Sequence, residues 1–282
     1  MRAVALGGGH GTAVVLRALQ RISQHVTGIV SVADDGGSSG ELRRLLGIPA
    51  VGDLRRCLSA TSSTNSPLAA HFEHRIAGGL HPLGNLVLAA ATIEEGNLTR
   101  AVDRVSLALG CTVTVLPATV DAVDLVAETS VGTIEGQVRV HGRSDVQRVA
   151  VTPRSAAAEP RALRSIADAD LIAIGPGSFF TSVLAAAVTP GIAEAIQTSR
   201  GRVVFLSNLL PEIPEAVGLN LQNQVSLLRE HGIRLDAVLC DERVAVPPAT
   251  HPLPVVHDLC DSTGRMHDPE KVAQALAALM AN

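Results

Sequence analysis

Short apolar segments that run into glycine-rich turns, and then into helical patterns, recur along this chain and constrain its fold most strongly. The first reads AVALG, followed by GGHG and TAVVLRALQRI, and the next apolar segment reads VTGIVSVAD. Apolar runs of this kind are typical of strands that are buried on both faces of a parallel sheet. Two such strands with a helix between them form a right-handed βαβ unit. The pattern therefore predicts an α/β fold for the first part of the chain.

The same alternation resumes after residue 155. Strands are expected at DLIAIG, RVVFLSN and RLDAVLCD, with helices at 160–168, at 219–231 and over the closing DPEKVAQALAALM. Between the two halves, helices are expected at 40–46, 53–61, 67–77, 85–95 and 98–109, and antiparallel strands follow at CTVTVLPAT, AVDLVAETS, TIEGQVRVHG and VQRVAVTP. We therefore expect an α/β fold with a Rossmann-like open, mostly parallel sheet, helices on both faces and a small β-rich insert.

The predicted organisation is a single α/β domain over residues 1–282. It consists of a nucleotide-binding half (1–110), the β-rich insert (about 111–155) and a second α/β half (156–282). With 23 basic and 27 acidic residues and neither Trp nor Tyr, the chain lacks the features typical of nucleic-acid binding. No signal peptide or apolar run of ~18 residues is found, and the scattered cysteines indicate reduced thiols. We expect a cytoplasmic protein that binds neither nucleic acid nor membrane.

Two glycine-rich turns stand where a predicted strand leads into a helix. GGGHGT spans Gly7 to Thr12, and GPGS spans Gly175 to Ser178. Glycines let backbone N–H groups approach an anion closely, and a helix N-terminus supplies about half a positive charge. GGGHGT is neither a full G-x-G-x-x-G fingerprint nor a Walker A loop. Both turns predict phosphate binding, with ordinary strand–helix turns as the alternative.

The stretch VADDGGSSG follows the second predicted strand. Asp34 and Asp35 stand at the carboxyl end of that strand, where ligands bind in open α/β sheets. One acid could hold a hydroxyl or Mg²⁺, while the glycines and serines offer donors to a phosphate. Arginine pairs follow at 43–44 and 55–56, either as ligand contacts or as solvated side chains. A solvated turn capped by Asp34 is the alternative for the whole stretch.

Other polar residues favour a structural interpretation. His81 is a lone histidine, which is more often structural than catalytic. Asn85 and Asp268, which precedes Pro269, have the positions of helix N-cap residues. The chain has no G-x-S-x-G elbow, H-E-x-x-H pair or C-x-x-C pair.

Taken in order, these motifs resemble the YvcK-type gluconeogenesis factor family, which is similar to the 2-phospho-L-lactate transferase (CofD-like) superfamily. The resemblance is carried by GGGHGTAVVLRAL, VSVADDGGSSGELR, IPAVGDLRRCL, PLGNLVLAA, LPAT, IGPGSFFTSVL and HDPEKVA, and it runs from about residue 3 to 277. It implies a cytoplasmic bacterial protein that binds a UDP-sugar such as UDP-N-acetylglucosamine and acts in carbon metabolism, cell shape and cell-wall supply. The related transferases imply Mg²⁺ and a nucleotide diphosphate-linked donor.

The resemblance also implies ligand-binding positions. By motif these are Gly8, Gly9, Gly11, Thr12, Asp34, Asp35, Gly37, Ser38, Ser39, Asp53, Asn85, Gly175, Gly177, Ser178, Thr181 and Asn208. His10 stands where the family usually has Thr, Phe180 where it often has Tyr, and Arg265 one position before the usual Arg, and these three are added as ligand contacts. NLLPEIPEAVG replaces the usual Asn-Leu-Met-Thr-Gln-Pro-Gly-Glu. Asp34 and Asp35 are the candidates for Mg²⁺ binding and for catalysis.

Three functions are compatible with these features. The first is a nucleotide-sugar-binding regulatory protein in which GGGHGT and GPGS hold the diphosphate. The second is a Mg²⁺-dependent transferase acting on a nucleotide diphosphate-linked donor, and the third is a scaffold that works through protein contacts. We favour the first, because a scaffold has no need for two glycine-rich anion loops. A homodimer with unidentified regulatory protein partners is the expected assembly.

Overall fold

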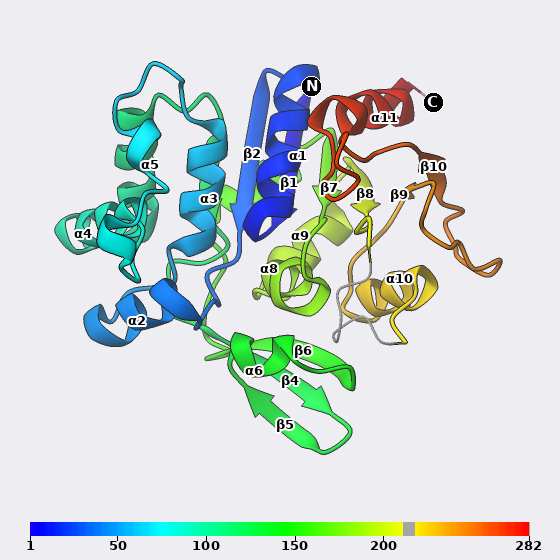
Figure 1. Ribbon diagram of the computed structural model, residues 1–282. Helices are drawn as coiled ribbons and strands as arrows, with labels where there is room; N and C mark the ends of the chain where they lie inside the picture. The colour runs from blue at the N-terminus through cyan, green and yellow to red at the C-terminus, as the bar shows by residue number, and fades with distance from the viewer. Residues whose placement is uncertain (211–217, 282) are drawn as a thin grey trace.

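A seven-stranded sheet forms the centre of the computed structural model, which describes residues 1–210 and 218–281. The strand order is β10-β9-β8-β7-β1-β2-β3, and each neighbouring pair is parallel. The strands are β1 (Arg2–Gly7), β2 (His25–Val30), β3 (Thr114–Pro117), β7 (Leu171–Ile174), β8 (Arg202–Leu206), β9 (Ala237–Asp241) and β10 (Val255–His257). Helices lie on both faces of this sheet (Figure 1), so the predicted open α/β architecture is confirmed.

The chain order reverses between β1 and β7, which pair directly with Ala3 opposite Leu171. From β1 the strands proceed outward through β2 to β3, whereas from β7 they proceed the other way through β8 and β9 to β10. Open α/β sheets bind ligands at such a switch point, outside the carboxyl ends of the strands. The loops that follow β1 and β7 are GGGHGT and GPGS, so the sheet topology brings these two distant motifs together.

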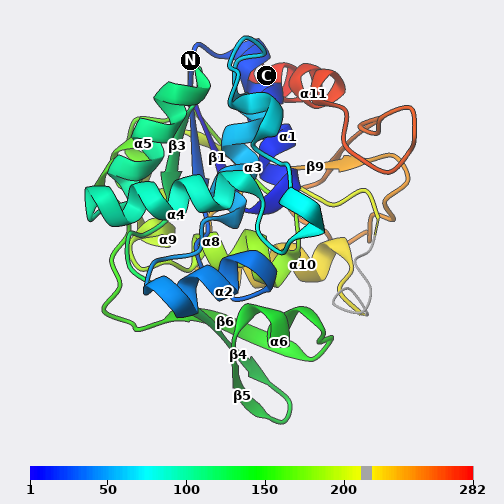
Figure 2. The ribbon, with the colours of Figure 1, turned by 60° about the vertical axis from the view of Figure 1, so that its left-hand side comes forward.

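The helices are arranged in layers around the sheet. On one face α1 (Gly9–Ile22) packs between α3 (Gly52–Thr61) and α11 (Pro269–Ala281). The opposite face carries α7 (Pro160–Ala167), α8 (Ala185–Ala187) and α9 (Ile192–Thr198), and α10 (Leu221–Glu230) lies near the last strands. Figure 2 shows α2 (Gly37–Leu46), α4 (Leu83–Glu95) and α5 (Leu98–Leu109) outside α3. The amphipathic pattern of α1 explains its packing, because Val15, Leu16 and Leu19 are fully buried.

The predicted helix over residues 67–77 is wrong. Only two short 3-10 turns form there, Ala69–His71 and Ile76–Gly78, and Ala77 adopts a left-handed φ of 50°. The segment carries no continuous apolar stripe, and its carbonyl groups find partners elsewhere. The carbonyl oxygens of Phe72 and His74 accept hydrogen bonds from the first residues of α4.

A small antiparallel sheet projects from the main body (Figure 1) and corresponds to the predicted β-rich insert. It consists of β4 (Asp124–Thr129), β5 (Gly132–Glu135) and β6 (Val146–Thr152), in the order β5-β4-β6. Two segments differ from the prediction. Residues 114–117 belong to the main sheet, where β3 pairs with β2, because their apolar side chains are buried. Residues 137–141 form a helix, α6 (Gln137–His141), after Gly136 turns the chain at φ 104°. We call residues 124–152 the insert lobe.

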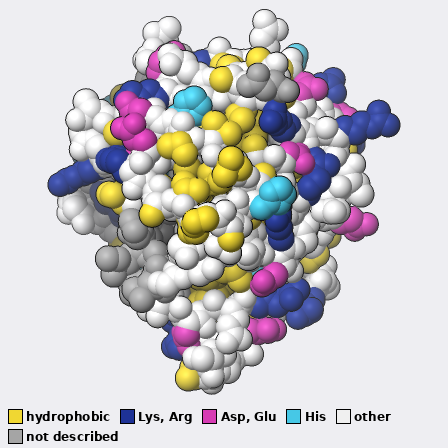
Figure 3. All heavy atoms as spheres, turned by 90° about the vertical axis from the view of Figure 1, so that its right-hand side faces the viewer, with side chains coloured by type: hydrophobic (Ala, Val, Ile, Leu, Met, Phe, Trp, Pro, Cys, Tyr) yellow, Lys and Arg dark blue, Asp and Glu magenta, His cyan; other side chains and the backbone are white. Residues whose placement is uncertain are grey.

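No single helix within residues 1–210 and 218–281 is long and apolar enough to cross a membrane. One pair of apolar segments, Phe179–Ala187 and Ile192–Thr198, passes by length and composition together, but it is bent by 70°. Most of its apolar side chains are buried in the core. Figure 3 shows the side of the molecule that carries β10 and α10, where hydrophobic side chains gather on the surface.

Candidate functional site

The loops after β1 and β7 meet through their backbones. A Cβ atom on Gly11 would lie 2.1 Å from the carbonyl oxygen of Pro176, and one on Gly8 would lie 2.4 Å from Asp53 Oδ2. At Gly11 the obstructing atoms belong to backbone, so the packing of the two loops requires glycine there, whereas at Gly8 the Asp53 side chain would have to move. The first turn of α1 therefore lies directly against the GPGS loop and the start of α3.

The GPGS loop is held in place by Asn208, which follows β8. Asn208 Oδ1 accepts a hydrogen bond from Gly177 N at 2.9 Å, and its Nδ2 donates to Gly177 O at 2.9 Å. The Thr181 hydroxyl donates to Ser178 Oγ at 2.6 Å, where the chain enters a π-helix at Phe179–Leu184. π-helical turns are rare and are found frequently at functional sites. Four of the predicted positions, Gly177, Ser178, Thr181 and Asn208, thus lie together and are held by hydrogen bonds.

A polar cavity of about 300 Å³ lies at the N-terminal ends of α1, α2 and α3. Among its lining residues are the predicted positions Gly9, Asp34, Gly37, Ser38, Ser39, Asp53, Asn85 and Thr181, together with Arg55, Arg56 and Arg75. Three helix N-termini and three guanidinium groups around one cavity attract an anion, whereas the carboxylates of Asp34 and Asp53 in the same lining favour a cation or a hydroxyl group. We call it the polar cavity.

A buried acid, Asp53, and a partly buried one, Asp34, share the polar cavity. Burial raises the pKa of Asp34, and the neighbouring charge of Asp53 raises it further. Burial also raises the pKa of Asp53, although Arg56, 2.6 Å from Asp53 Oδ1, opposes that shift. For both carboxylates, the positive charge nearby does not offset the cost of burial. Carboxylate and hydroxyl oxygens are the ligands that Mg²⁺ prefers, so Asp34, Asp53 and the hydroxyl of Ser39 fit such an ion chemically.

Asp35 points away from the polar cavity. Its Oδ1 accepts a hydrogen bond from Val138 N at 2.8 Å, in the first turn of α6. A Cβ atom on Gly136 would lie 2.5 Å from Asp35 Oδ2, so the contact is close. The adjacent acids Asp34 and Asp35 therefore serve different partners, and the acid that shares the cavity with Asp34 is Asp53. Asp35 thus joins the insert lobe to the loop that follows β2.

Ser38 lies in a network of polar side chains at the outer wall of the polar cavity. Its hydroxyl lies 2.9 Å from His81 Nδ1 and accepts a hydrogen bond from Asn85 Nδ2 at 2.8 Å. Arg55 is 5% exposed and pairs with Glu73 at 3.0 Å. Within the described residues, Asn85 Oδ1 and Arg55 Nε are buried without a hydrogen-bond partner. Two residues that line the polar cavity therefore each have one polar atom without a hydrogen-bond partner.

A second cavity of about 220 Å³ lies on the other side of the first turn of α1. It is lined by His10, Gly11, Gly177, Asn208, Arg265 and His267, together with apolar neighbours, and we call it the loop cavity. Burial lowers the pKa of His10, and the charge of Arg56 lowers it further. The predicted contacts His10 and Arg265 therefore lie in one cavity with both glycine-rich loops.

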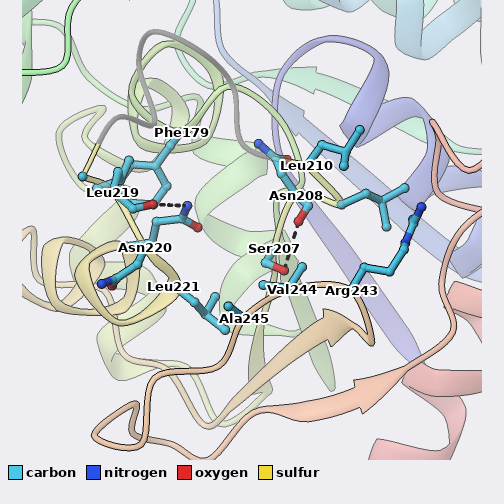
Figure 4. Close-up of a pocket in the computed structure, with 13 residues that line it drawn as sticks. Phe179, Ser207, Asn208, Leu210, Leu219, Asn220, Leu221, Arg243, Val244 and Ala245 are labelled. Atoms are coloured by element: carbon cyan, nitrogen blue, oxygen red, sulfur yellow. Dashed lines mark hydrogen bonds between the residues drawn. The ribbon is translucent and has the colours of Figure 1, made fainter.

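A third cavity, of about 450 Å³, is mainly apolar (Figure 4). Phe179, Leu219, Leu221 and Val244 line it beside the polar side chains of Asn220, Gln224 and Arg243. We call it the apolar cavity. It shares Asn208, Leu209 and Leu210 with the loop cavity, so the two are adjacent. Residues 211–217 of the unusual stretch NLLPEIPEAVG lie outside the described residues.

Six predicted positions are absent from the linings of these three cavities: Gly8, Thr12, Asp35, Gly175, Ser178 and Phe180. Thr12 is fully buried and donates to Gly8 O at 3.2 Å, which fixes the first turn of α1. Gly175 adopts a φ of 78° that favours glycine. Phe180 is buried with its ring centre 5.3 Å from that of Phe179, so the aromatic residue at the apolar cavity is Phe179.

The model of the 2-phospho-L-lactate transferase CofD family matches residues 3–268 of the chain. The chain belongs to this family.

Relatives of this CofD-family chain carry the predicted family name. A gluconeogenesis factor of Halalkalibacterium halodurans is 39% identical over 81% of this chain and 73% of its own length. The gluconeogenesis factor of Bacillus subtilis is 38% identical over 80% of this chain and 73% of its own length. A crystal structure of a UPF0052 family protein from Bacillus halodurans matches with a TM-score of 0.92, at 32% identity and over 98% of both chains. The resemblance to gluconeogenesis factors is thus confirmed.

Several residues at the site of the CofD-family chain were not found from the sequence. Ser31 and Ser182 line the polar cavity and lie within the quoted motifs VSVADDGGSSGELR and IGPGSFFTSVL, but neither was among the predicted ligand-binding positions. Arg75 and Gln137 reach the same cavity from segments with no recognisable motif. His267, two positions after the predicted contact Arg265, also lines the loop cavity and was not predicted.

Proposed function

We propose that this CofD-family chain binds a nucleoside diphosphate sugar, with a UDP-sugar such as UDP-N-acetylglucosamine as the ligand. It would act as a cytoplasmic regulatory protein in carbon metabolism, cell shape and cell-wall supply, as a homodimer with regulatory protein partners. The observation that carries the proposal is a row of three cavities: two are lined by the first turn of α1, and the apolar cavity adjoins one of these two. Together they offer an apolar end, a glycine-rich centre and a polar end.

The nucleoside is assigned to the apolar cavity. Ligand sites are mostly apolar, with a few polar groups that fix orientation. Phe179 offers an aromatic ring for the base, and the amide groups of Asn220 and Gln224 offer both donors and acceptors. The volume of about 450 Å³ lies within the range of small-molecule sites, roughly 300–1,000 Å³.

The diphosphate is assigned to the loop cavity. The first turn of α1 presents backbone N–H groups there, and Arg265 adds a charged donor. No acidic side chain is among the lining residues that the structure describes for this cavity. An anion therefore meets attraction from both sides and no repulsion from a neighbouring carboxylate.

The sugar is assigned to the polar cavity, on the far side of the same helix turn. Asp34 and Asp53 can accept hydrogen bonds from sugar hydroxyls, and the unpartnered Asn85 Oδ1 adds another acceptor. A sugar hydroxyl would add a donor to those that these acids already have, Gly36 N for Asp34 and the Arg56 guanidinium for Asp53. It would also remove part of the cost of burying two neighbouring carboxylates.

A Mg²⁺-dependent transferase acting on a nucleotide diphosphate-linked donor is the second candidate, and the two neighbouring acids Asp34 and Asp53 favour it. Asp34 and Asp53 would hold the ion, which would offset charge on the leaving phosphate. Arg56 orients Asp53, and the helix N-termini of α2 and α3 would bind phosphate oxygens. Release of nucleotide from UDP-N-acetylglucosamine or a related donor, measured with and without Mg²⁺, distinguishes this candidate from a binding protein.

A thermal-shift panel tests the first proposal. A ligand present at 100 times its dissociation constant stabilises the fold by about 2.7 kcal/mol, so the melting temperature should rise by several degrees with UDP-sugars. The variant Arg265→Gln removes a charged donor from the loop cavity and should reduce the shift. The exposed Arg200→Gln, outside all three cavities, is the matched control. Melting temperatures unmoved by UDP-sugars, by other nucleotides and by Mg²⁺ would refute the proposal.

A further inference from the structure

Gln137 brings a side chain of the insert lobe to the polar cavity. Among the lobe's residues 124–152, all of which belong to the described part of the chain, it alone lines that cavity. A Cβ atom on Gly36, another lining residue, would lie 3.9 Å from Gln137 Oε1 and 3.3 Å from Asp34 Oδ1. The amide of Gln137 and the carboxylate of Asp34 therefore lie beside the same point of the cavity wall.

The helix that carries Gln137 lies between two walls of the polar cavity. On one side, Val138 N donates to Asp35 Oδ1 at 2.8 Å, in the loop that follows β2. On the other side, α6 packs against the π-helix Phe179–Leu184, which contributes two residues to the lining. The position of α6 is thus tied to both walls of the cavity.

The helix α6 has few contacts of its own that keep it folded. It contains five residues, and so short a helix is marginal in water without tertiary contacts. Val140 alone among these five residues is buried, and the other four are at least partly exposed. Segments with few buried apolar contacts open locally more readily than the core does. One additional contact can therefore change how often α6 opens.

The Gln137 amide can form such a contact with a bound molecule. No hydrogen bond of its side chain to another described residue is found. A side-chain amide both donates and accepts, whereas carboxylates only accept and guanidinium groups only donate. Gln137 can therefore pair with a hydroxyl or an amide group of a sugar in either direction, beside acids and arginines that can each act in one direction only.

We propose that Gln137 binds the sugar in the polar cavity and that this contact stabilises α6 in its folded position. The inference rests on the proposed function, which assigns the sugar to that cavity. Because the hydrogen bond forms only when the sugar is present, the ligand favours the folded helix, and the folded helix strengthens binding by the same factor. The exposed side of α6 then differs between the empty and the occupied protein, which gives a regulatory partner a feature to recognise.

Hydrogen–deuterium exchange of residues 136–142 tests this inference in the wild-type protein. It is measured without ligand, with saturating UDP and with saturating UDP-N-acetylglucosamine. The amides of Val138 and Val140 donate hydrogen bonds in the folded helix, so their exchange reports its opening. UDP lacks the sugar and should leave the exchange unchanged. The UDP-sugar should slow it about two- to tenfold, which corresponds to one hydrogen bond.

Two variants remove the amide group. Gln137→Ala truncates the side chain, and Gln137→Met retains its length without a polar atom that can pair strongly. Both should bind UDP as the wild type does, lose about two- to tenfold in affinity for UDP-N-acetylglucosamine and show no slowing of exchange by the sugar. Arg139→Ala changes an exposed residue of the same helix outside the cavity lining, so it is the matched control and should behave like the wild type.

Three results overturn the inference. The first is equal exchange at residues 136–142 with UDP and with UDP-N-acetylglucosamine in the wild type. The others are a Gln137 variant that keeps the slowing and an Arg139→Ala variant that loses it, because either result separates the effect from the amide. Melting temperatures of the unliganded variants identify any loss of folding, and the better-folded Gln137 variant then supplies the comparison. If the wild-type protein binds neither ligand, the proposed function fails together with this inference, whereas binding without slowed exchange refutes this inference alone.

Discussion

Replacement of Gly11 by Ala should destabilise the protein and weaken ligand binding together. The added Cβ atom would lie 2.1 Å from Pro176 O and 2.6 Å from Pro176 C. Both atoms belong to backbone, so no side chain can rotate away, and the first turn of α1 must separate from the GPGS loop by roughly 1 Å. Overpacking of this kind costs about 1–3 kcal/mol, whereas Ala in place of Gly within a helix recovers only about 1 kcal/mol.

The net destabilisation from Gly11→Ala is expected at about 1–2 kcal/mol, since a clash between two backbones lies at the upper end of the range. For a chain of this size, that corresponds to a fall in melting temperature of roughly 2–8 °C. The assay is thermal unfolding without ligand, followed by titration with UDP-N-acetylglucosamine. The affinity should fall at least tenfold, because the anion-binding turn has moved.

Gly142→Ala is the matched control for Gly11→Ala. Gly142 has φ −84°, and no atom lies within 4 Å of the position of its Cβ. Its stability should therefore stay within about 0.5 kcal/mol of the wild type, with unchanged affinity. If Gly11→Ala behaves like this control in both measurements, the close contact between the two loops is refuted.

Further predictions concern the acids and the clamp on the GPGS loop. Asp35→Ala should leave nucleotide affinity nearly unchanged but cost about 0.5–2 kcal/mol of stability, as loss of a helix cap does, and hydrogen exchange should speed up at residues 136–141. Because burial raises the pKa of Asp34, the native state binds protons more readily than the unfolded state, so this group makes the protein less stable as pH rises. Asp34→Asn should therefore raise the melting temperature at pH 7, with a gain that shrinks on acidification, and a gain independent of pH would contradict the reasoning. Asn208→Ala removes both hydrogen bonds to Gly177 and should cost about 1–3 kcal/mol with weaker ligand binding; urea unfolding measures the first effect.

The main sheet and the meeting of its loops were predictable because the relevant signals are local. β1, β2 and β7 are apolar runs that end in glycines or acids, and parallel strands place their carboxyl ends at one edge. Two distant glycine-rich loops could therefore be assigned to one site without knowledge of any side-chain contact. The insert lobe was recognised through its alternating pattern for the same reason.

The directions of individual side chains were not predictable. Asp34 and Asp35 are neighbours in an irregular loop, and the partner that draws Asp35 away, Val138, is remote in sequence. The choice between Phe179 and Phe180 depends on a π-helix, whose periodicity differs from that of the α-helix assumed in sequence patterns. Residues 137–141, which form α6, were predicted as part of a strand. Exposed Val138 and buried Val140 alternate there in the manner of a strand.

A crystal structure of the protein with UDP-N-acetylglucosamine tests the central claim most directly. The proposed function predicts the diphosphate at the first turn of α1, within hydrogen-bond distance of the Gly9–Gly11 backbone, with the base against Phe179. The sugar should then face Asp34 and Asp53. A nucleotide bound away from the β1–β7 switch point, or one whose phosphates point into solvent at this site, would contradict the account.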